Sequence, residues 1–351
     1  MILRRVLKIG SIILLSIVSL LVVISLYFYL SVKPTVWLVR WAFNQSSYTS
    51  HESISNIKEE VLIYEDLVYP SKYKKNKFDI FVAEENKDKT NLKTILWIHG
   101  GAFVAGDKKD VKDHMYVLAS KGYVVISMNY GLGFENKYPT PLLQITELYN
   151  HLLNSSETYK FIDLSNPILG GDSAGAFIAA QFAIIQTNQL YSDLVGIKAS
   201  INHNDIKGMI LFCGPYDFNM LKNLLSNTSI TNSSNIIIRK GVPLIINKIG
   251  EAFLNDKNWS TSDKWQELSL INYINEDFPK TFLTDGNTLS FEDHARELEA
   301  KLIEKEVLVK SVYYDAKLTH EYQFNLSTIN NDGRNYGMET HNELLLYLQS
   351  L

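Results

Sequence analysis

Short runs of apolar residues alternate with longer segments of helical character along most of the chain. The short runs predict buried strands at Thr94–Ile98, Tyr123–Met128, Pro167–Gly170, Gly208–Phe212, Thr281–Thr284 and Val307–Tyr314. Ala174–Ile185 has the apolar content of a helix packed on a sheet. From Val61 onward, this alternation predicts an α/β fold: an open, mostly parallel sheet with helices on both faces.

A long uncharged segment lies near the N-terminus. Residues 9–30, about 22 in number, are dominated by leucine, isoleucine, valine and serine, enough for a helix to span ~30 Å of hydrocarbon. Arg4, Arg5 and Lys8 precede it, which favours a cytoplasmic segment 1–8 and an extracytoplasmic location for the rest. A cleaved signal peptide is the alternative, but its apolar core is usually about 7–15 residues, and residues 31–34 lack a small-residue cleavage site. We therefore expect a single-pass membrane protein with an uncleaved signal anchor.

Two segments depart from the strand–helix pattern. Residues 31–60 form a linker or cap segment in which Trp37 and Trp41, four positions apart, share one face of a helix. That face either lies at the membrane interface, where tryptophan is favoured, or packs over the active site. Residues 219–275 interrupt the pattern with a polar and then an amphipathic stretch, where we expect a small cap. Residues 61–351 as a whole are expected to form one α/β domain.

Composition narrows the class of partner. The formal net charge is −4, and the chain has no basic stripe of the kind that binds nucleic acid. Cys213 is the single cysteine, so no internal disulfide can form. No cluster has zinc or calcium spacing, and no dinucleotide fingerprint is present. We therefore expect neither a metal nor a cofactor.

One pentapeptide joins a predicted strand to a predicted helix. The strand Pro167–Gly170 runs into Gly171-Asp172-Ser173-Ala174-Gly175, and the helix follows directly. This is the sequence form of a nucleophile elbow, a turn so tight that its central serine is exposed to substrate in a strained conformation. Glycines on both sides keep neighbouring backbone free of side-chain collisions. The pattern predicts Ser173 as a nucleophile.

A second motif supplies the loop that an acyl-transfer enzyme needs. The strand Thr94–Ile98 ends in His99-Gly100-Gly101-Ala102-Phe103. Negative charge grows on a carbonyl oxygen under attack, and backbone N–H groups aimed at that oxygen stabilise it. We expect the N–H groups of Gly100, Gly101 and Ala174 to form this oxyanion hole.

The two motifs together resemble the hormone-sensitive-lipase-like branch of the α/β-hydrolases. That branch typically carries HGGG followed by an aromatic residue, and then GDSAG. In this chain Ala102 replaces the third glycine, which leaves a backbone N–H in place, while Phe103 and residues 171–175 match. The likeness covers roughly residues 75–350. It implies an α/β-hydrolase fold and a serine esterase or lipase.

In this fold the acid and then the histidine follow the nucleophile along the chain. Of eight histidines, His320 alone has the right position, because it follows the strand Val307–Tyr314 across a short polar loop. The resemblance places the general base there. We expect His320 to accept the proton of Ser173.

The acid is less obvious, because the family's aspartate aligns with Leu289, which cannot orient an imidazole. Asp285, at the end of the strand Thr281–Thr284, has the right chemical type and a rigid anchor. Glu292 has a longer reach and lies in the first turn of a predicted helix, where Ser290 and Asp293 mark the start. Asp285 is our first choice and Glu292 the alternative.

These features predict a serine carboxylesterase or lipase-like hydrolase that cleaves small-molecule, lipid or polymer esters through an acyl-enzyme on Ser173. Two alternatives remain. A serine peptidase of related fold uses the same triad, and a degenerate hydrolase serving as a binding or envelope protein would explain Leu289. The N-terminal helix adds the membrane as a partner.

Overall fold

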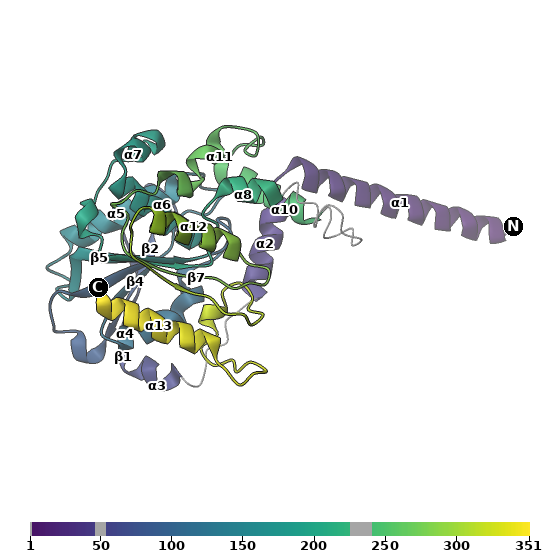
Figure 1. Ribbon diagram of the computed structural model, residues 1–351. Coiled ribbons are helices and arrows are strands. Elements are labelled where there is room, and N and C mark those ends of the chain that lie inside the picture. The colour runs from purple at the N-terminus through teal and green to yellow at the C-terminus, as the bar shows by residue number, and fades with distance from the viewer. Residues whose placement is uncertain (1, 46–53, 225–240) are drawn as a thin grey trace.

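The computed structural model describes residues 2–45, 54–224 and 241–351, which form a layered α/β domain with one long helix projecting from it (Figure 1). The strands are β1 (Val61–Val68), β2 (Lys77–Ala83), β3 (Leu92–Ile98), β4 (Val124–Met128), β5 (Ile162–Asp172), β6 (Gly208–Phe212), β7 (Thr281–Thr284) and β8 (Val309–Val312). The N-terminal helices are α1 (Ile2–Leu30), α2 (Lys33–Gln45) and α3 (Ser55–Glu59). The later helices are α4 (Lys112–Ser120), α5 (Thr140–Asn154), α6 (Ala174–Thr187), α7 (Gln189–Val195), α8 (Phe218–Leu224), α10 (Val242–Leu254), α11 (Lys264–Glu267), α12 (Glu292–Glu304) and α13 (Tyr336–Ser350).

The strands form one sheet in the order β1-β2-β4-β3-β5-β6-β7-β8. The pairs β1–β2 and β2–β4 are antiparallel, and every later pair, from β3–β4 to β7–β8, is parallel. The predicted mostly parallel sheet is therefore confirmed. The carboxyl ends of the parallel strands meet at one edge of the sheet, where ligand sites of open α/β sheets lie.

Alternating strand residues divide the core into two layers. Leu96, Leu169 and Leu211 pack with α5, α6 and α12 on one face. Their neighbours Ile95, Ile168 and Ile210 pack with α4 and α13 on the other face. Side chains alternate across a strand, so strands buried on both faces read as continuous apolar runs. Helix α6 is buried along its whole length, which fixes the residue that precedes it.

Helix α1 is 29 residues long and projects away from the domain (Figure 1). Its segment Arg4–Leu30 is long and apolar enough to cross a membrane, and none of its most apolar window is buried. These properties are compatible with a single-pass membrane anchor or a signal sequence. The extracytoplasmic location of the domain stays a prediction.

Helix α2 follows α1 after two residues and packs on the domain. Its Val36 is fully buried, whereas Trp37 is 56% and Trp41 62% exposed. The tryptophan side chains therefore do not pack over the active site, which was one of the two placements that the sequence left open for them.

The expected cap, residues 219–275, contains most of α8, all of α10, and α11. Its segment 225–240 lies outside the described residues. Phe253 in α10 stacks on Phe103 of the oxyanion loop with ring centroids 4.3 Å apart. The described part of this segment therefore lies against the end of the sheet that carries the serine turn of residues 171–175.

Candidate active site

Ser173 occupies the turn between β5 and α6 in a backbone conformation that few residues adopt. Its φ is 51° and its ψ −120°, and its N–H donates to the Phe212 carbonyl oxygen at 2.7 Å. A Cβ on Gly175 would lie 2.0 Å from the Ile98 carbonyl oxygen, and one on Gly171 would lie 2.5 Å from backbone of Gly175. Glycine is therefore required on both sides of the serine. Strain of this kind is typical of a functional turn, and here it directs the Ser173 hydroxyl out of the sheet.

His320 lies in the loop after β8, and its Nε2 is 2.9 Å from the Ser173 Oγ. The ring also contacts Phe291 edge-on, with centroids 5.4 Å apart. Burial lowers the pKa of His320, an effect partly opposed by the nearby Glu321 carboxylate. A lowered pKa keeps the imidazole neutral near pH 7, as a proton acceptor must be.

The other ring nitrogen of His320 meets a serine rather than a carboxylate. Its Nδ1 lies 2.7 Å from the Ser290 Oγ, and this hydroxyl donates to the Asp285 Oδ1. Since Ser290 has one proton and gives it to the carboxylate, its oxygen must accept the Nδ1–H of His320. This leaves Nε2 unprotonated and facing Ser173. The chain of contacts therefore runs Asp285, Ser290, His320, Ser173.

Asp285 lies at the end of β7 and is almost fully buried. Burial raises the pKa of this carboxyl to about 7, against opposing contributions from Ser290, Cys213 and the Gly286 backbone. Asp285 therefore changes its charge close to neutral pH. When protonated it can donate to Ser290, which can then donate to Nδ1 and reverse the chain of hydrogen bonds.

Two positions weighed for the acid lie elsewhere. Leu289 is 94% exposed with a φ of 52°, so the position aligned with the family's aspartate points into solvent. Glu292 begins α12, as the sequence indicates, but its carboxylate accepts the Arg296 Nε at 2.8 Å. The alternative assignment of Glu292 as the partner of His320 is thus contradicted, because its carboxylate is directed along its own helix.

The oxyanion loop follows β3, and its first glycine is already engaged. The Gly100 N–H donates to the Asp172 Oδ2 at 2.7 Å, and the Trp97 indole donates to Oδ1 of the same carboxyl at 2.8 Å. This contradicts the expectation that Gly100 supplies an oxyanion donor. Gly101 and Ala102 follow with φ of 120° and 50°, and Ala102 lines a cavity with Ser173 and Ala174. The N–H groups of Gly101 and Ala102, one residue further along the loop, are therefore better candidates for the oxyanion donors than those of Gly100 and Gly101.

Two carboxyl groups lie beside this loop. Burial raises the pKa of Asp172, and the nearby Glu321 raises it further. The Glu321 Oε1 is 3.8 Å from the His320 Nε2. Because Asp172 precedes Ser173 and Glu321 follows His320, the interaction of these two carboxyl groups joins the two turns that carry Ser173 and His320.

An apolar cavity of about 120 Å³ opens beside the Ser173 side chain. Its walls are almost entirely apolar and come from the oxyanion loop, α8, α10 and the start of α12. The aromatic and branched residues in these walls include Phe103, Phe218, Ile246, Ile249, Phe253 and Trp259. A larger groove of about 540 Å³ near Arg40 and Asp107 is lined by charged groups and does not include Ser173 or His320. The small apolar cavity, unlike this groove, reaches Ser173 and can receive a group attached to a carbonyl there.

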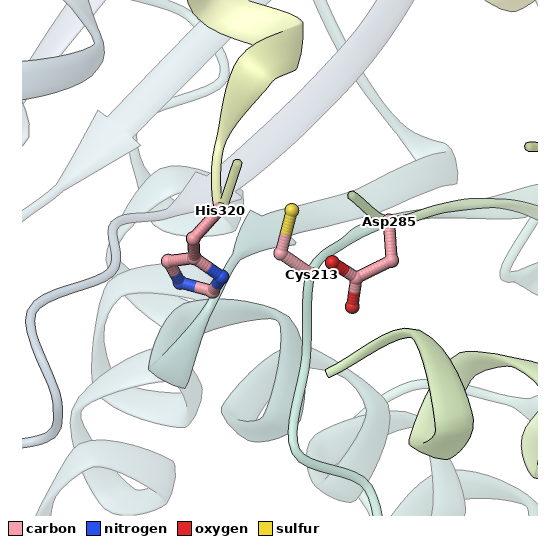
Figure 2. A group of neighbouring side chains, drawn as sticks. All are labelled: Cys213, Asp285 and His320. Carbon is pink, nitrogen blue, oxygen red and sulfur yellow. The ribbon is translucent and has the colours of Figure 1, made fainter. Parts of the chain in front are cut away.

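One group among the described residues has the donor types of a metal site. Figure 2 shows Cys213, Asp285 and His320 converging, with one donor atom of each within 4.8 Å of the others. A metal ion requires a thiolate and a carboxylate. Burial raises the pKa of both Cys213 and Asp285, so the protonated forms are favoured. The Cys213 Sγ contacts the Gln323 Oε1 at 3.2 Å, and the cluster fits hydrogen bonding better than a cation.

Sequence reasoning missed three residues that contact this site. In the sequence Ser290 marks only the start of a helix, whereas its hydroxyl contacts His320 and Asp285. Ala102 entered only as a substituted glycine, and Glu321, directly after His320, belongs to no motif. Each acquires its place through contacts between segments far apart in the chain, such as the 30 residues that separate Ser290 from His320.

Comparison with known proteins places this geometry in a family. The structure is similar to the crystal structure of esterase B from Lactobacillus Rhamnosis (HN001), with a TM-score of 0.67 and 18% identity, covering 91% of this chain and 95% of that chain. A structure of that enzyme with a C4-C4 SN3 tributyrin phosphonate has a TM-score of 0.64, with the same identity and coverage. The "Putative alpha/beta hydrolase R526" of Acanthamoeba polyphaga mimivirus is 28% identical over 101 residues, so the match spans 28% of either chain. The expected α/β-hydrolase fold is confirmed by these structures. The BD-FAE family model matches residues 78–302, more than half of the chain, and the protein is a member of the BD-FAE family.

Proposed function

We propose that the protein is a serine carboxylesterase in which Ser173 is the nucleophile and His320 the general base. The observation that carries this proposal is the 2.9 Å contact between the Ser173 Oγ and the His320 Nε2, with Ser173 held at a φ of 51°. A serine hydroxyl is a weak nucleophile unless an adjacent base takes its proton as it attacks. The esterase B structures, one of them with a phosphonate, support the same reaction class.

In the acylation step, the Ser173 Oγ attacks the ester carbonyl carbon and its proton passes to the His320 Nε2. The carbonyl π electrons move to oxygen, and the N–H groups of Gly101, Ala102 and Ala174 stabilise that oxyanion. When the C=O bond reforms, the bond to the alcohol oxygen breaks, and the Nε2 proton goes to the leaving alkoxide. Water then attacks the acyl-enzyme by the same route, which releases the acid and restores Ser173.

Asp285 acts on the imidazole through Ser290. As His320 becomes an imidazolium, its Nδ1–H bond to Ser290 and the Ser290 bond to the carboxylate strengthen together. The arrangement also fixes the tautomer in which Nε2 faces the nucleophile. Removing such a group from a triad typically lowers kcat by about 10⁴-fold, mostly through loss of the correct tautomer.

The substrate is an ester with a small apolar acyl group. The cavity beside Ser173 is about 120 Å³ and nearly devoid of polar lining. A panel of p-nitrophenyl acetate, butyrate, octanoate and palmitate tests this choice, and we expect butyrate to be turned over faster than palmitate. Aminoacyl amides in the same panel test the peptidase alternative.

Labelling by an organophosphonate tests the nucleophile directly. We expect one covalent adduct, mapped by mass spectrometry to Ser173, and none in Ser173→Ala. Labelling at another residue, or unchanged p-nitrophenyl acetate hydrolysis in Ser173→Ala, contradicts the proposal. The degenerate-hydrolase alternative drew its support from Leu289, and the contact of Asp285 with Ser290 weakens that support.

We further propose that α1 remains attached as a membrane anchor with the catalytic domain outside the cytoplasm. Arg4, Arg5 and Lys8 at the start of α1 and the uncharged stretch 9–30 that follows them support this orientation. Protease treatment of intact cells tests it: the domain should be degraded without lysis. Intact-mass measurement of the purified protein shows whether residues 1–30 are still present.

A further inference from the structure

Helix α2 has two faces that meet different surroundings. On the inner face, Val36 packs against Val104 and Ala252. The Arg40 Nε donates to the Val104 carbonyl oxygen at 2.7 Å, and its two terminal nitrogens contact Glu135 at 2.7 and 2.6 Å. These contacts fix the helix on the domain with a defined outward face.

The inner face lies directly against the walls of the acyl cavity. Val104 follows Phe103, which lines that cavity, and Ala252 precedes Phe253, which also lines it. Ile249 of α10 touches both the cluster around Val36 and the cavity. A surface that contacts the outside of α2 is therefore separated from the substrate cavity by α2 and the cavity wall on which it packs.

The outward face is large and apolar. Trp37 is 56%, Leu38 44% and Trp41 62% exposed, and positions three and four apart lie together on a helix. An exposed pair of indoles beside a leucine is unusual on a protein surface that faces water. Trp37 is only seven positions beyond Leu30, where the apolar helix α1 ends.

We propose that this face of α2, formed by Trp37, Leu38 and Trp41, lies in the interfacial layer of a lipid bilayer. Tryptophan is enriched at that depth because its ring is apolar and its N–H remains polar. An amphipathic helix with such a face binds in the plane of the interface. Lys33, at the start of α2, is exposed, and its ammonium lies over the Phe134 ring, 5.4 Å from the ring centroid. The domain thus has a second contact with lipid in addition to α1, and this contact holds the oxyanion loop and α10 beside the bilayer.

The occupant is a bilayer rather than a protein because α1 brings one within reach. A helix that spans hydrocarbon and ends at Leu30 leaves the next turn at the level of the headgroups. The inner face of α2 is already occupied by Val104, Ala252 and Glu135, so only the tryptophan face can turn toward the lipid.

Bromolipid quenching of the full chain in lipid nanodiscs tests the proposal. The discs contain phosphatidylcholine, either unbrominated or brominated near the headgroup. Of the five tryptophans, Trp97 and Trp259 are fully buried, and Trp265 is half-buried. We expect bromolipid to quench the wild type and the control Trp265→Phe equally. The variant Trp37→Phe/Trp41→Phe should lose most of that quenching, at least a twofold drop in the quenched fraction.

Aqueous acrylamide provides the second readout. In unbrominated discs, the acrylamide-sensitive emission of the wild type should be well below that of a protein from which residues 1–30 have been removed, measured in detergent-free solution. If the truncated protein is insoluble, the measurement in discs suffices alone. Equal bromolipid quenching of the wild type and the double variant overturns the proposal. Protection from acrylamide without bromolipid quenching also overturns it, because another protein surface then covers α2. Thermal unfolding of the double variant near the wild-type Tm shows that its fold is intact.

Discussion

Replacing Ser290 by alanine tests the most specific feature of the proposed mechanism. The serine hydroxyl links the imidazole to the buried carboxyl: it lies 2.7 Å from the His320 Nδ1 on one side and contacts the Asp285 Oδ1 on the other. Alanine removes both hydrogen bonds but leaves the backbone, the nucleophile and the base in place. The Nδ1–H then loses its acceptor, and the tautomer of His320 is no longer fixed.

The expected loss follows from the kind of hydrogen bond removed. A bond to a group that becomes charged contributes about 1.5–3 kcal/mol. The imidazolium exists only as the reaction proceeds, so this energy is lost mainly from the transition state and lowers kcat by about 10- to 150-fold with little change in KM. The loss should be smaller than the ~10⁴-fold effect of removing a triad carboxylate, because the Asp285 carboxyl itself stays within 4.8 Å of the His320 ring nitrogen.

The assay is steady-state hydrolysis of p-nitrophenyl butyrate across pH 5–9. Ser290→Thr keeps a hydroxyl and should recover most of the activity. Thr288→Ala is the matched control, because it lies two positions away in the same loop and its hydroxyl donates to the Asn287 Oδ1 rather than to Asp285 or His320. If Ser290→Ala retains the wild-type kcat, or if Thr288→Ala loses as much, the hydroxyl does not link Asp285 to His320.

Four further predictions follow from the same structure. The kcat/KM of the wild type should rise as the pH passes about 7, because Asp285 must lose its proton before it can accept a hydrogen bond from Ser290. In Asp285→Asn this rise should be lost, or should move below pH 6.5 because the lowered pKa of His320 then controls it. Asp285 should also cost stability: its pKa is about 7 when folded and ~3.9 when unfolded, so its favourable contribution is present below pH 4 and is lost as the pH rises to 7. The loss is up to ~4 kcal/mol, and denaturant unfolding at pH 5 and pH 8 should show a smaller pH dependence in Asp285→Asn. Ile249→Ala should enlarge the acyl cavity and raise octanoate turnover relative to butyrate, measured with the p-nitrophenyl panel. Arg40→Ala should lower the free energy of unfolding by about 1–3 kcal/mol, since the Val104 carbonyl loses its donor, and an unchanged denaturation midpoint would contradict the contacts assigned to α2.

The sequence predicted those parts of the site that depend on local backbone. The glycines around Ser173 are required by contacts with residues in the same turn and with Ile98 at the end of the adjacent strand. The residue types of the motif are therefore enough to predict the backbone conformation of the turn. The strands predicted for the parallel sheet agree with β3 to β8 to within a few residues, because buried strands are apolar on both faces. His320 could be selected because order along the chain restricts the general base to one loop.

The remaining parts depend on contacts that no local pattern encodes. Gly100 was expected to donate to an oxyanion, but its N–H is held by Asp172, 72 positions away. The face of Trp37 and Trp41 was predicted correctly as a shared face, yet which face packs on the domain depends on Val104 and Glu135. The spacing of two residues along a helix predicts that their side chains share a face, but not which part of the protein that face contacts.

The position of the acid and the presence of Ser290 have one physical explanation. At position 289 the loop carries an exposed leucine with a positive φ, so no carboxylate approaches the imidazole from there. Asp285 is instead fixed at the end of β7, where the strand backbone prevents it from moving toward the histidine. The Ser290 hydroxyl lies between the two groups and hydrogen-bonds to both. It links the negative charge of Asp285 to the imidazole only while the carboxyl is ionised. Because burial raises the pKa of that carboxyl to about 7, we expect the same arrangement that bridges the gap to make the activity depend on pH near neutrality.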